Sequence, residues 1–212
     1  MRTVSLNGML TSLSTNFNRR NKNVRLYELG NIYLPKQVPV TELPEERMQF
    51  TLGMYGEGDF FTMKGVIEEF LYKAGMKLKP EYDPEAGKPF LHPGRQANVV
   101  YDGTVIGYLG EVHPTVAANY AIKERVYVAV LDMPEIVSHA SFDHKYEGIA
   151  KFPAAARDIS MVVPKKVLAG DIEKIFDEKG GQFLEKYDLF DIYEGAPVSY
   201  THLRAHETLM NL

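Results

Sequence analysis

Residues 151–164 have the sequence Lys-Phe-Pro-Ala-Ala-Ala-Arg-Asp-Ile-Ser-Met-Val-Val-Pro. Pro153 fixes a rigid corner, because the proline ring locks the backbone angle φ. The alternation of apolar and other residues from Asp158 to Val163 is typical of a β-strand. These features together predict that a new domain begins in this stretch.

The residues that follow extend this prediction. A helix is expected at about residues 170–179, because Gly180 and Gly181 come directly after it, and a second strand is expected at residues 183–193. A strand, a helical crossover and a strand make up the first half of a ferredoxin-like unit. The sequence therefore predicts an incomplete ferredoxin-like β-α-β unit over residues 150–195.

The part before this unit alternates helices and strands without internal repeats. Asp59 is a good helix N-cap, because its carboxylate can accept an unpartnered backbone N–H in the first turn. Asp102 and Gly103 favour a tight hairpin turn. The expected helices cover residues 4–17 and 59–74, and the expected strands cover residues 24–29, 48–55, 96–101, 104–111 and 125–131. This pattern predicts a domain over residues 1–139, joined by a linker at residues 140–149 to the second domain.

The composition is that of an ordinary globular protein, with 45% hydrophobic and 25% charged residues. The net charge of −4 argues against RNA binding by bulk electrostatics, so any RNA contact must come from a local patch. The absence of cysteine excludes disulfides and thiolate metal sites and suits a reducing compartment. No apolar run approaches the ~20 residues of a membrane span. We therefore expect a cytoplasmic protein without membrane contact.

Chemically suggestive residues are few in the first domain. His92, Asp102, Glu111 and His113 form the one cluster that suggests a metal, but their spacing matches no zinc motif, so no metal site is predicted. Arg95 is expected in a structural ion pair, with binding of a carboxylate or phosphate as the less favoured alternative. No catalytic constellation is visible.

The second domain carries candidate RNA contacts. Lys151 and Arg157 are suited to phosphate groups through charge-assisted hydrogen bonds. Pairing of Arg157 with Asp158 or another carboxylate is an equally good interpretation. Aromatic side chains in the second strand allow stacking on unpaired bases, although aromatic residues in strands more often pack in a core. These aromatic residues are Phe183, Tyr187, Phe190 and Tyr193.

Several motifs, found in one consistent order, resemble the β subunit of bacterial phenylalanine–tRNA ligase. The motif that best marks the family is the pair formed by His92 to Ala97 and Ile106 to Pro114. The other matching stretches are Met1 to Leu10, Leu26 to Gly30, Asp59 to Gly65, and Lys151-Phe152-Pro153 with Arg157-Asp158-Ile159. The resemblance covers residues 1 to about 195.

The resemblance implies a fold and partners for each part. Residues 1–139 correspond to a non-catalytic class II synthetase-like core domain with an antiparallel sheet and flanking helices, so the overall fold class is α+β. Residues 150–195 correspond to an anticodon-binding domain. Family members form a heterotetramer of two α and two β subunits that attaches phenylalanine to tRNA-Phe. ATP and Mg²⁺ are used in the α subunit, and none is expected to bind here.

The family also implies what this chain lacks and what it contacts. Family members carry further domains before this point, so Met1 is expected to be an internal methionine. The helices at residues 4–17 and 59–74 are candidates for contact with the α subunit. Within this chain alone we expect no catalytic activity.

The end of the chain departs from the family. After Gly195, residues 196–212 resemble the translation of an adapter used in sequencing libraries, and we predict that this tail is non-native. The second domain is then expected to hold two strands and one helix, which leaves apolar faces uncovered. We therefore expect residues 150–195 to pack poorly or to lean on the first domain.

Two other hypotheses remain. The chain can instead be a stand-alone RNA-binding or protein-interaction module without a synthetase partner. A metal-dependent hydrolase that uses His92 and His113 is the least supported hypothesis.

Overall fold

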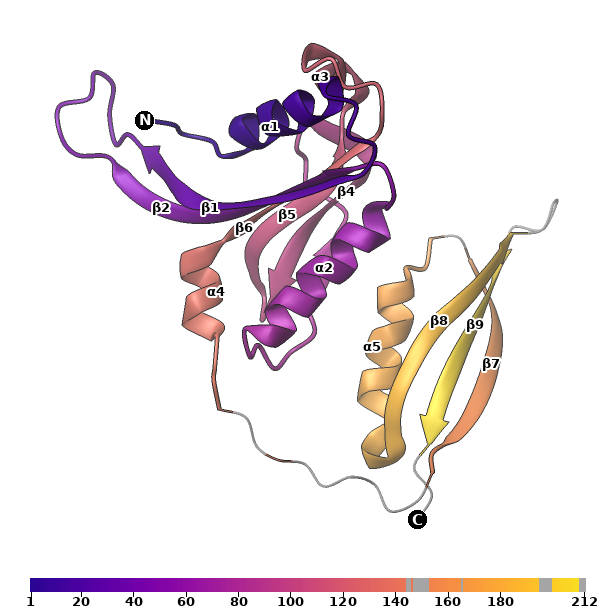
Figure 1. The fold of residues 1–212 in the computed structure, drawn as a ribbon. Coiled ribbons are helices and arrows are strands. Elements are labelled where there is room, and N and C mark those ends of the chain that lie inside the picture. The colour runs from indigo at the N-terminus through magenta and orange to yellow at the C-terminus, as the bar shows by residue number, and fades with distance from the viewer. Residues whose placement is uncertain (144–145, 147–152, 165, 195–199, 210–212) are drawn as a thin grey trace. The chain divides into compact units, whose positions relative to one another are not determined.

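The computed structural model describes residues 1–143, 146, 153–164, 166–194 and 200–209, with residues 193–194 and 200–209 described by their backbone alone. The chain forms two compact units, unit 1 (Met1–His144) and unit 2 (Lys145–Leu212). Figure 1 shows their elements. Each unit combines an antiparallel sheet with helices, so the predicted α+β class is confirmed.

Unit 1 is built on a six-stranded sheet in the order β1-β2-β6-β5-β4-β3. All of its strand pairs are antiparallel. The strands are β1 (Val24–Leu34), β2 (Glu45–Tyr55), β3 (Glu81–Asp83), β4 (Leu91–Tyr101), β5 (Thr104–Val112) and β6 (Val126–Asp132). The helices are α1 (Leu6–Asn18), α2 (Phe60–Lys73), α3 (Pro114–Asn119) and α4 (Met133–His139).

Strand β6 lies inside the sheet and is buried on both faces. Every residue from Val126 to Leu131 is buried. Val126 and Val128 pack in the hydrophobic cluster that includes α1, whereas Tyr127, Ala129 and Leu131 pack in the cluster that includes α2. The alternation of side chains along a strand sends them to opposite faces, so the two helices cover the two faces of the sheet.

Helix α2 has clear start and stop signals. The Asp59 carboxylate accepts the Thr62 N–H at 2.8 Å, and the Thr62 hydroxyl oxygen accepts the Asp59 N–H at 3.2 Å, which forms a capping box. Met63, Ile67 and Leu71, spaced four residues apart, form the buried face. The chain leaves the helix at Gly75, where φ is +77° and a Cβ would lie 1.6 Å from the Ser141 carbonyl oxygen. Only glycine fits there.

The sequence placed most elements of unit 1 correctly and missed the short ones. The helices at residues 4–17 and 59–74 and the hairpin turn are confirmed, since Asp102 and Gly103 both have positive φ. Three elements were not expected, namely β3, α3 and α4. Each spans seven residues or fewer, so none shows a full hydrophobic period. Strands β1, β2 and β4 are also longer than predicted.

Unit 2 contains β7 (Ala155–Pro164), α5 (Ala169–Lys179), a short 3₁₀ helix (Gly181–Phe183), β8 (Leu184–Glu194) and β9 (Tyr200–Leu209). The sheet order is β7-β9-β8, and both pairs are antiparallel. Strands β7 and β8 are therefore parallel to each other and joined by helix α5. This is the β-α-β crossover that the sequence predicted.

The expectation of two strands in unit 2 was wrong for the structure. A third strand, β9, pairs with both β7 and β8. A physical reason is that a crossover leaves its two parallel strands one strand-width apart, and an antiparallel strand in the gap satisfies the inner backbone groups of both. The hydrogen bonds between strands are made by backbone groups, so the pairing of β9 does not show where residues 196–212 come from. The non-native tail therefore stays a prediction.

The interior of unit 2 is less buried than that of unit 1. Among the residues whose side chains are described, unit 2 has no buried residue. Helix α5 likewise has none. Within the described part of the chain, no helix combines the length and hydrophobicity that crossing a membrane requires.

The cap of α2 gives a test of stability and pH. Asp59→Ala is expected to lower the unfolding free energy of unit 1 by about 1 kcal/mol, because a first-turn N–H loses its acceptor. The hydrogen bond from the Thr62 backbone N–H, followed by that with the Thr62 side chain, lowers the pKa of Asp59. The ionised Asp59 carboxylate therefore stabilises the fold fully at pH values above the pKa of about 3.9 that it has in the unfolded chain. This stabilisation is lost as the pH falls through the lower pKa that the carboxyl group has in the folded chain.

Urea unfolding of both proteins at about pH 7 and at about pH 2.5 measures the difference. The penalty of Asp59→Ala is expected to shrink at the lower pH. Asp59→Asn is the control, since its amide oxygen still accepts the bond. An equal Asp59→Ala penalty at both pH values would contradict the assignment.

The contrast in burial gives a second test. Limited proteolysis is expected to remove residues 155–192 first and to leave a fragment close to residues 1–144, because local stability follows buried apolar contact. Mass spectrometry of the digest identifies the fragment. Equal protection of β7, α5 and unit 1 would show that unit 2 is as stable as unit 1.

Candidate functional site

The four residues considered for a metal have other roles. The His92 Nδ1 accepts the Gly94 N–H at 3.1 Å, and the His113 Nδ1 accepts the Thr115 N–H at 3.3 Å at the start of α3. Asp102 forms the hairpin turn, and Glu111 pairs with an arginine. In the described part of the chain, no three His, Asp or Glu side chains come together as a metal site. The hydrolase hypothesis gains no support from this geometry.

Arg95 lies in the structural ion pair that the sequence favoured. Its Nη1 donates to both carboxylate oxygens of Glu111, at 3.0 and 3.1 Å. The Glu111 side chain is only 4% exposed, whereas that of Arg95 is 41% exposed. The guanidinium therefore reaches from a buried carboxylate toward the surface.

Of the two residues predicted to contact RNA, the structure describes only Arg157. Lys151 lies outside the described residues. Arg157 is exposed near the start of β7, and its Nη1 donates to the Ala156 carbonyl oxygen at 2.8 Å. Neighbouring residues of a strand point to opposite faces, so pairing of Arg157 with Asp158 is not favoured. RNA contact by Lys151 and Arg157 stays a prediction.

The aromatic residues of unit 2 divide between core and surface. The Tyr187 ring lies 5.3 Å from that of Phe176, and its hydroxyl donates to the Asp177 carboxylate at 2.7 Å. Burial, and then the hydrogen bond with Asp177, raise the pKa of Tyr187. Phe190 is exposed and Phe183 is at the surface, while the side chain of Tyr193 is not described. Tyr187 is therefore a packing residue, and Phe190 is the better candidate for stacking.

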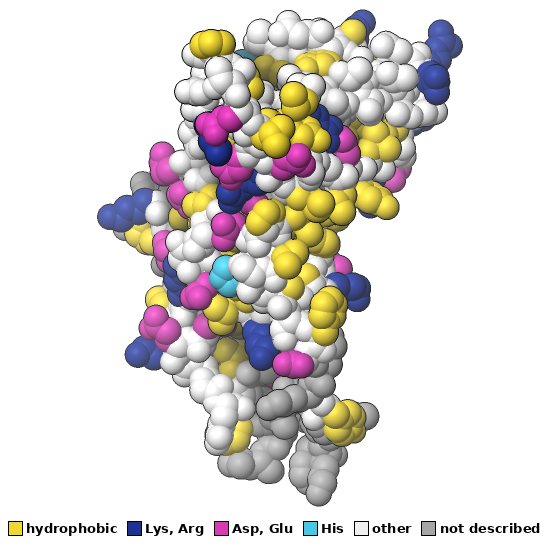
Figure 2. All heavy atoms as spheres, turned by 90° about the vertical axis from the view of Figure 1, so that its left-hand side faces the viewer, with side chains coloured by type: hydrophobic (Ala, Val, Ile, Leu, Met, Phe, Trp, Pro, Cys, Tyr) yellow, Lys and Arg dark blue, Asp and Glu magenta, His cyan; other side chains and the backbone are white. Residues whose placement is uncertain are grey.

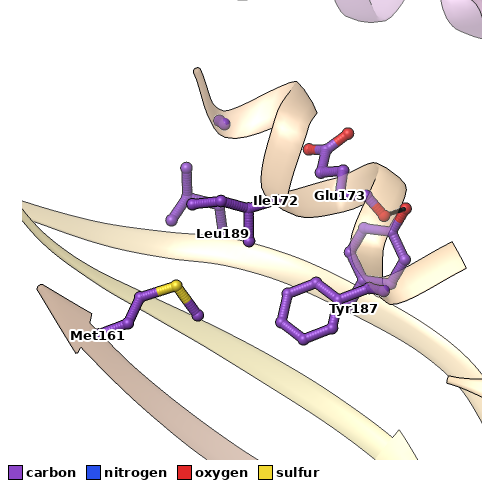
Figure 3. A pocket seen from close by; sticks show the side chains of 7 residues that line it. Met161, Ile172, Glu173, Tyr187 and Leu189 are labelled. Atoms are coloured by element: carbon purple, nitrogen blue, oxygen red, sulfur yellow. Dashed lines mark hydrogen bonds between the residues drawn. The ribbon is translucent and has the colours of Figure 1, made fainter. Parts of the chain in front are cut away.

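Unit 2 also has a small hollow between α5 and its sheet. Figure 3 shows Met161, Ile172, Tyr187 and Leu189 around it, with Glu173 above on the helix. Its volume is about 20 Å³. That is far below the ~300–1,000 Å³ of small-molecule sites and holds about one water. We interpret it as loose packing and not as a ligand site.

Unit 1 exposes apolar side chains beside α2. Tyr27 and Leu29 of edge strand β1 are 75% and 54% exposed. The Tyr27 ring lies 5.9 Å from that of Phe50, which stacks on Phe70 of α2 at 4.6 Å. Val66 lies one helical turn from Phe70 and is also exposed. We call Tyr27, Leu29, Phe50, Val66 and Phe70 the α2–β1 patch.

Contiguous exposed apolar surface of this kind is typical of an interaction site. Figure 2 shows hydrophobic side chains gathered on the face that it draws, with charged side chains around them. The exposed side chains of α1 are instead mostly polar, among them Asn7, Thr11 and Thr15. Of the two helices that the sequence proposed for subunit contact, α2 is therefore the better candidate. The sequence missed β1, because Tyr27 and Leu29 match an ordinary strand pattern.

Two family models match the chain in succession. The phenylalanyl tRNA synthetase beta chain CLM domain matches residues 1–133. The ferredoxin-fold anticodon binding domain matches residues 150–205. The match of the second model follows the strand and helix pattern of unit 2.

Curated relatives match along both units. The phenylalanine–tRNA ligase beta subunits of Clostridium acetobutylicum and Clostridium tetani are each 40% identical over 198 residues, which is 93% of this chain and 25% of theirs. The beta subunit of Bacillus subtilis is 34% identical over 197 residues, 88% of this chain and 24% of its own length. The chain thus spans about a quarter of the length of these relatives.

A solved structure supports the fold class. The pyrrolysyl-tRNA synthetase from Desulfitobacterium hafniense is similar with a TM-score of 0.52 at 12% identity, over 65% of this chain and 48% of that chain. This likeness confirms a class II synthetase-like fold and carries no functional detail. From the two family models and the identity to these relatives, the chain belongs to the phenylalanine–tRNA ligase beta subunit family.

Proposed function

We propose that this chain acts within a phenylalanine–tRNA ligase as part of the β subunit, where unit 1 binds the α subunit and unit 2 contacts tRNA-Phe. The observation that carries the proposal is the 40% identity to named beta subunits across both units. The match to an anticodon binding domain supports the RNA contact. A heterotetramer of two α and two β subunits and a cytoplasmic location are parts of the same proposal.

Aminoacylation itself is assigned to the α subunit, together with ATP and Mg²⁺. We also propose that unit 1 binds no ATP. Arg25, at the start of β1, donates to the Glu57 carbonyl oxygen at 3.4 Å, and Glu28 forms an ion pair with Arg2. These side chains are used within the fold, and we derive no catalytic step from this chain.

The α2–β1 patch is the surface we propose for the α subunit. It combines exposed aromatic and aliphatic side chains on an edge strand and a helix, which suits the apolar centre of a stable interface. The stand-alone module is less favoured, because both family models match in succession as expected for a beta subunit.

Association with the α subunit tests this part of the proposal. The chain is co-expressed with the α subunit from the same source, and the complex is measured by pull-down and size-exclusion chromatography. The double variant Tyr27→Glu with Leu29→Glu is expected to weaken the complex more than about tenfold, because two charges enter an apolar interface.

The matched control places the same change on exposed apolar side chains outside α1, α2 and β1. Leu78 and Val105 are 55% and 54% exposed, and Leu78→Glu with Val105→Glu is expected to leave the complex intact. Thermal unfolding shows whether each variant folds. Equal retention of the α subunit by both double variants would place the interface elsewhere.

Salt-dependent RNA binding tests unit 2. Arg157→Gln is expected to weaken binding of tRNA-Phe several-fold at low salt. The salt slope, which is the fall of the logarithm of the binding constant with the logarithm of the salt concentration, is expected to decrease by about 1, because one phosphate contact is lost. Fluorescence anisotropy measures both quantities. Lys179→Gln, an exposed cation in the last turn of α5, is the control. The same loss in both variants would mean that Arg157 has no specific contact.

A further inference from the structure

Unit 1 contains a cavity that the proposed subunit interface does not use. It lies where β4, β5 and the segment before β6 meet, and its volume is about 280 Å³. Val112, Ala117 and Ile122 form an apolar wall. The polar and charged side chains that line it are His92, Arg95, Glu111, Lys123, Glu124 and Arg125.

A large bulge in β4 brings Arg95 to this cavity. The register passes from Leu91 opposite Val112 to Gln96 opposite Gly110, so residues 92–95 lie opposite the single residue 111. A bulge of this kind aims a side chain away from the regular ladder and is common next to functional sites. Gly110 is required beside it, because a Cβ there would lie 2.8 Å from the Arg95 carbonyl oxygen.

The bulge also fixes His92. Its Nδ1 accepts the Gly94 N–H at 3.1 Å. The proton of the neutral ring is therefore on Nε2, which is a donor. A histidine that lines the cavity with this tautomer can donate a hydrogen bond to an anion.

Glu111 orients the guanidinium group of Arg95 by hydrogen bonds and lies within ion-pair distance of Arg125. Both of its bonds with Arg95 come from Nη1, and the Arg125 Nε lies 3.9 Å from its Oε1. Among the described residues the Arg95 side chain makes no other hydrogen bond, so its Nε and Nη2 donors remain for a ligand. Because the buried carboxylate uses only the Nη1 donor of Arg95, the other guanidinium donors can bind an oxyanion.

The local charge is opposite to that of the whole chain. Three cations, Arg95, Lys123 and Arg125, face two carboxylates, Glu111 and Glu124, which gives a local charge of +1 against −4 for the chain. The volume lies near the lower limit of ligand pockets. It suits one phosphate group better than a whole nucleotide.

We infer that this cavity binds a phosphate group of an RNA backbone, which gives unit 1 an RNA contact of its own. The choice of RNA rests on the proposed function. Arginine and lysine are the usual partners of RNA and DNA phosphates, and an arginine fork binds two phosphate oxygens at once. A carboxylate of a protein partner and a free small anion are the competing occupants.

Binding of tRNA-Phe to the 212-residue chain tests the inference. The double variant Lys123→Gln with Arg125→Gln removes two cavity cations and leaves the bonds between Arg95 and Glu111. Anisotropy at several salt concentrations is expected to show about tenfold weaker binding at low salt and a salt slope lower by about 1 to 2. Lys123→Gln alone gives a smaller loss and serves if the double variant unfolds.

The charge-matched control is Lys36→Gln with Lys77→Gln, two exposed lysines that do not line the cavity. It is expected to keep both the affinity and the slope of the unchanged chain. Equal loss in the control and the cavity variant would overturn the inference, as would no loss in either.

Three further measurements separate the competing occupants and the two proposals. Calorimetric binding of inorganic phosphate or ATP that depends on Lys123 and Arg125, with RNA binding unchanged, would identify a small-anion site and overturn the inference. Loss of α-subunit binding instead of RNA binding would indicate a protein carboxylate and overturn it too. If Arg157→Gln has no effect but the cavity variant does, the contact proposed for unit 2 fails and this one stands.

Discussion

The burial of β6 on both faces is the constraint on which unit 1 depends. Six consecutive residues from Val126 to Leu131 are buried, and all of them except Val130 alternate between two hydrophobic clusters. A strand of this composition is stable only when both faces of the sheet are covered. The amphipathic helices α1 and α2 supply that cover, which commits their apolar faces to the core.

The same arrangement leaves specific surfaces uncovered. Helix α2 covers the centre of its face of the sheet, so apolar side chains of edge strand β1 stay exposed as the α2–β1 patch. Farther along the sheet, the bulge in β4 replaces regular pairing with a charged cavity around the buried Glu111. One surface suits a protein partner and the other suits an anion. Unit 2 lacks such a buried interior in its described residues, which agrees with a part that depends on its context for stability.

Much of this was predictable from the sequence, for identifiable reasons. The cap at Asp59, the glycine at Gly75 and the turn at Asp102 and Gly103 act through a few adjacent residues, so local chemistry determines them. The sequence motifs identified the family. The sequence did not predict β3, α3, α4 or the third strand β9, since short elements and strands that fill a gap depend on their neighbours in space. Lys151, Arg157 and the non-native tail remain predictions.

The sequence by itself determined the main helices and strands and the membership of the family. Tertiary structure alone decided which side chains meet. Arg95 and Glu111 lie sixteen residues apart, and only the bulge opposite residue 111 joins them at one cavity with Arg125. Tyr27 and Phe70 are farther apart still, and they share a surface through Phe50. The physical reason is that periodicity encodes which face a residue occupies, whereas sheet order and register determine what lies beside it.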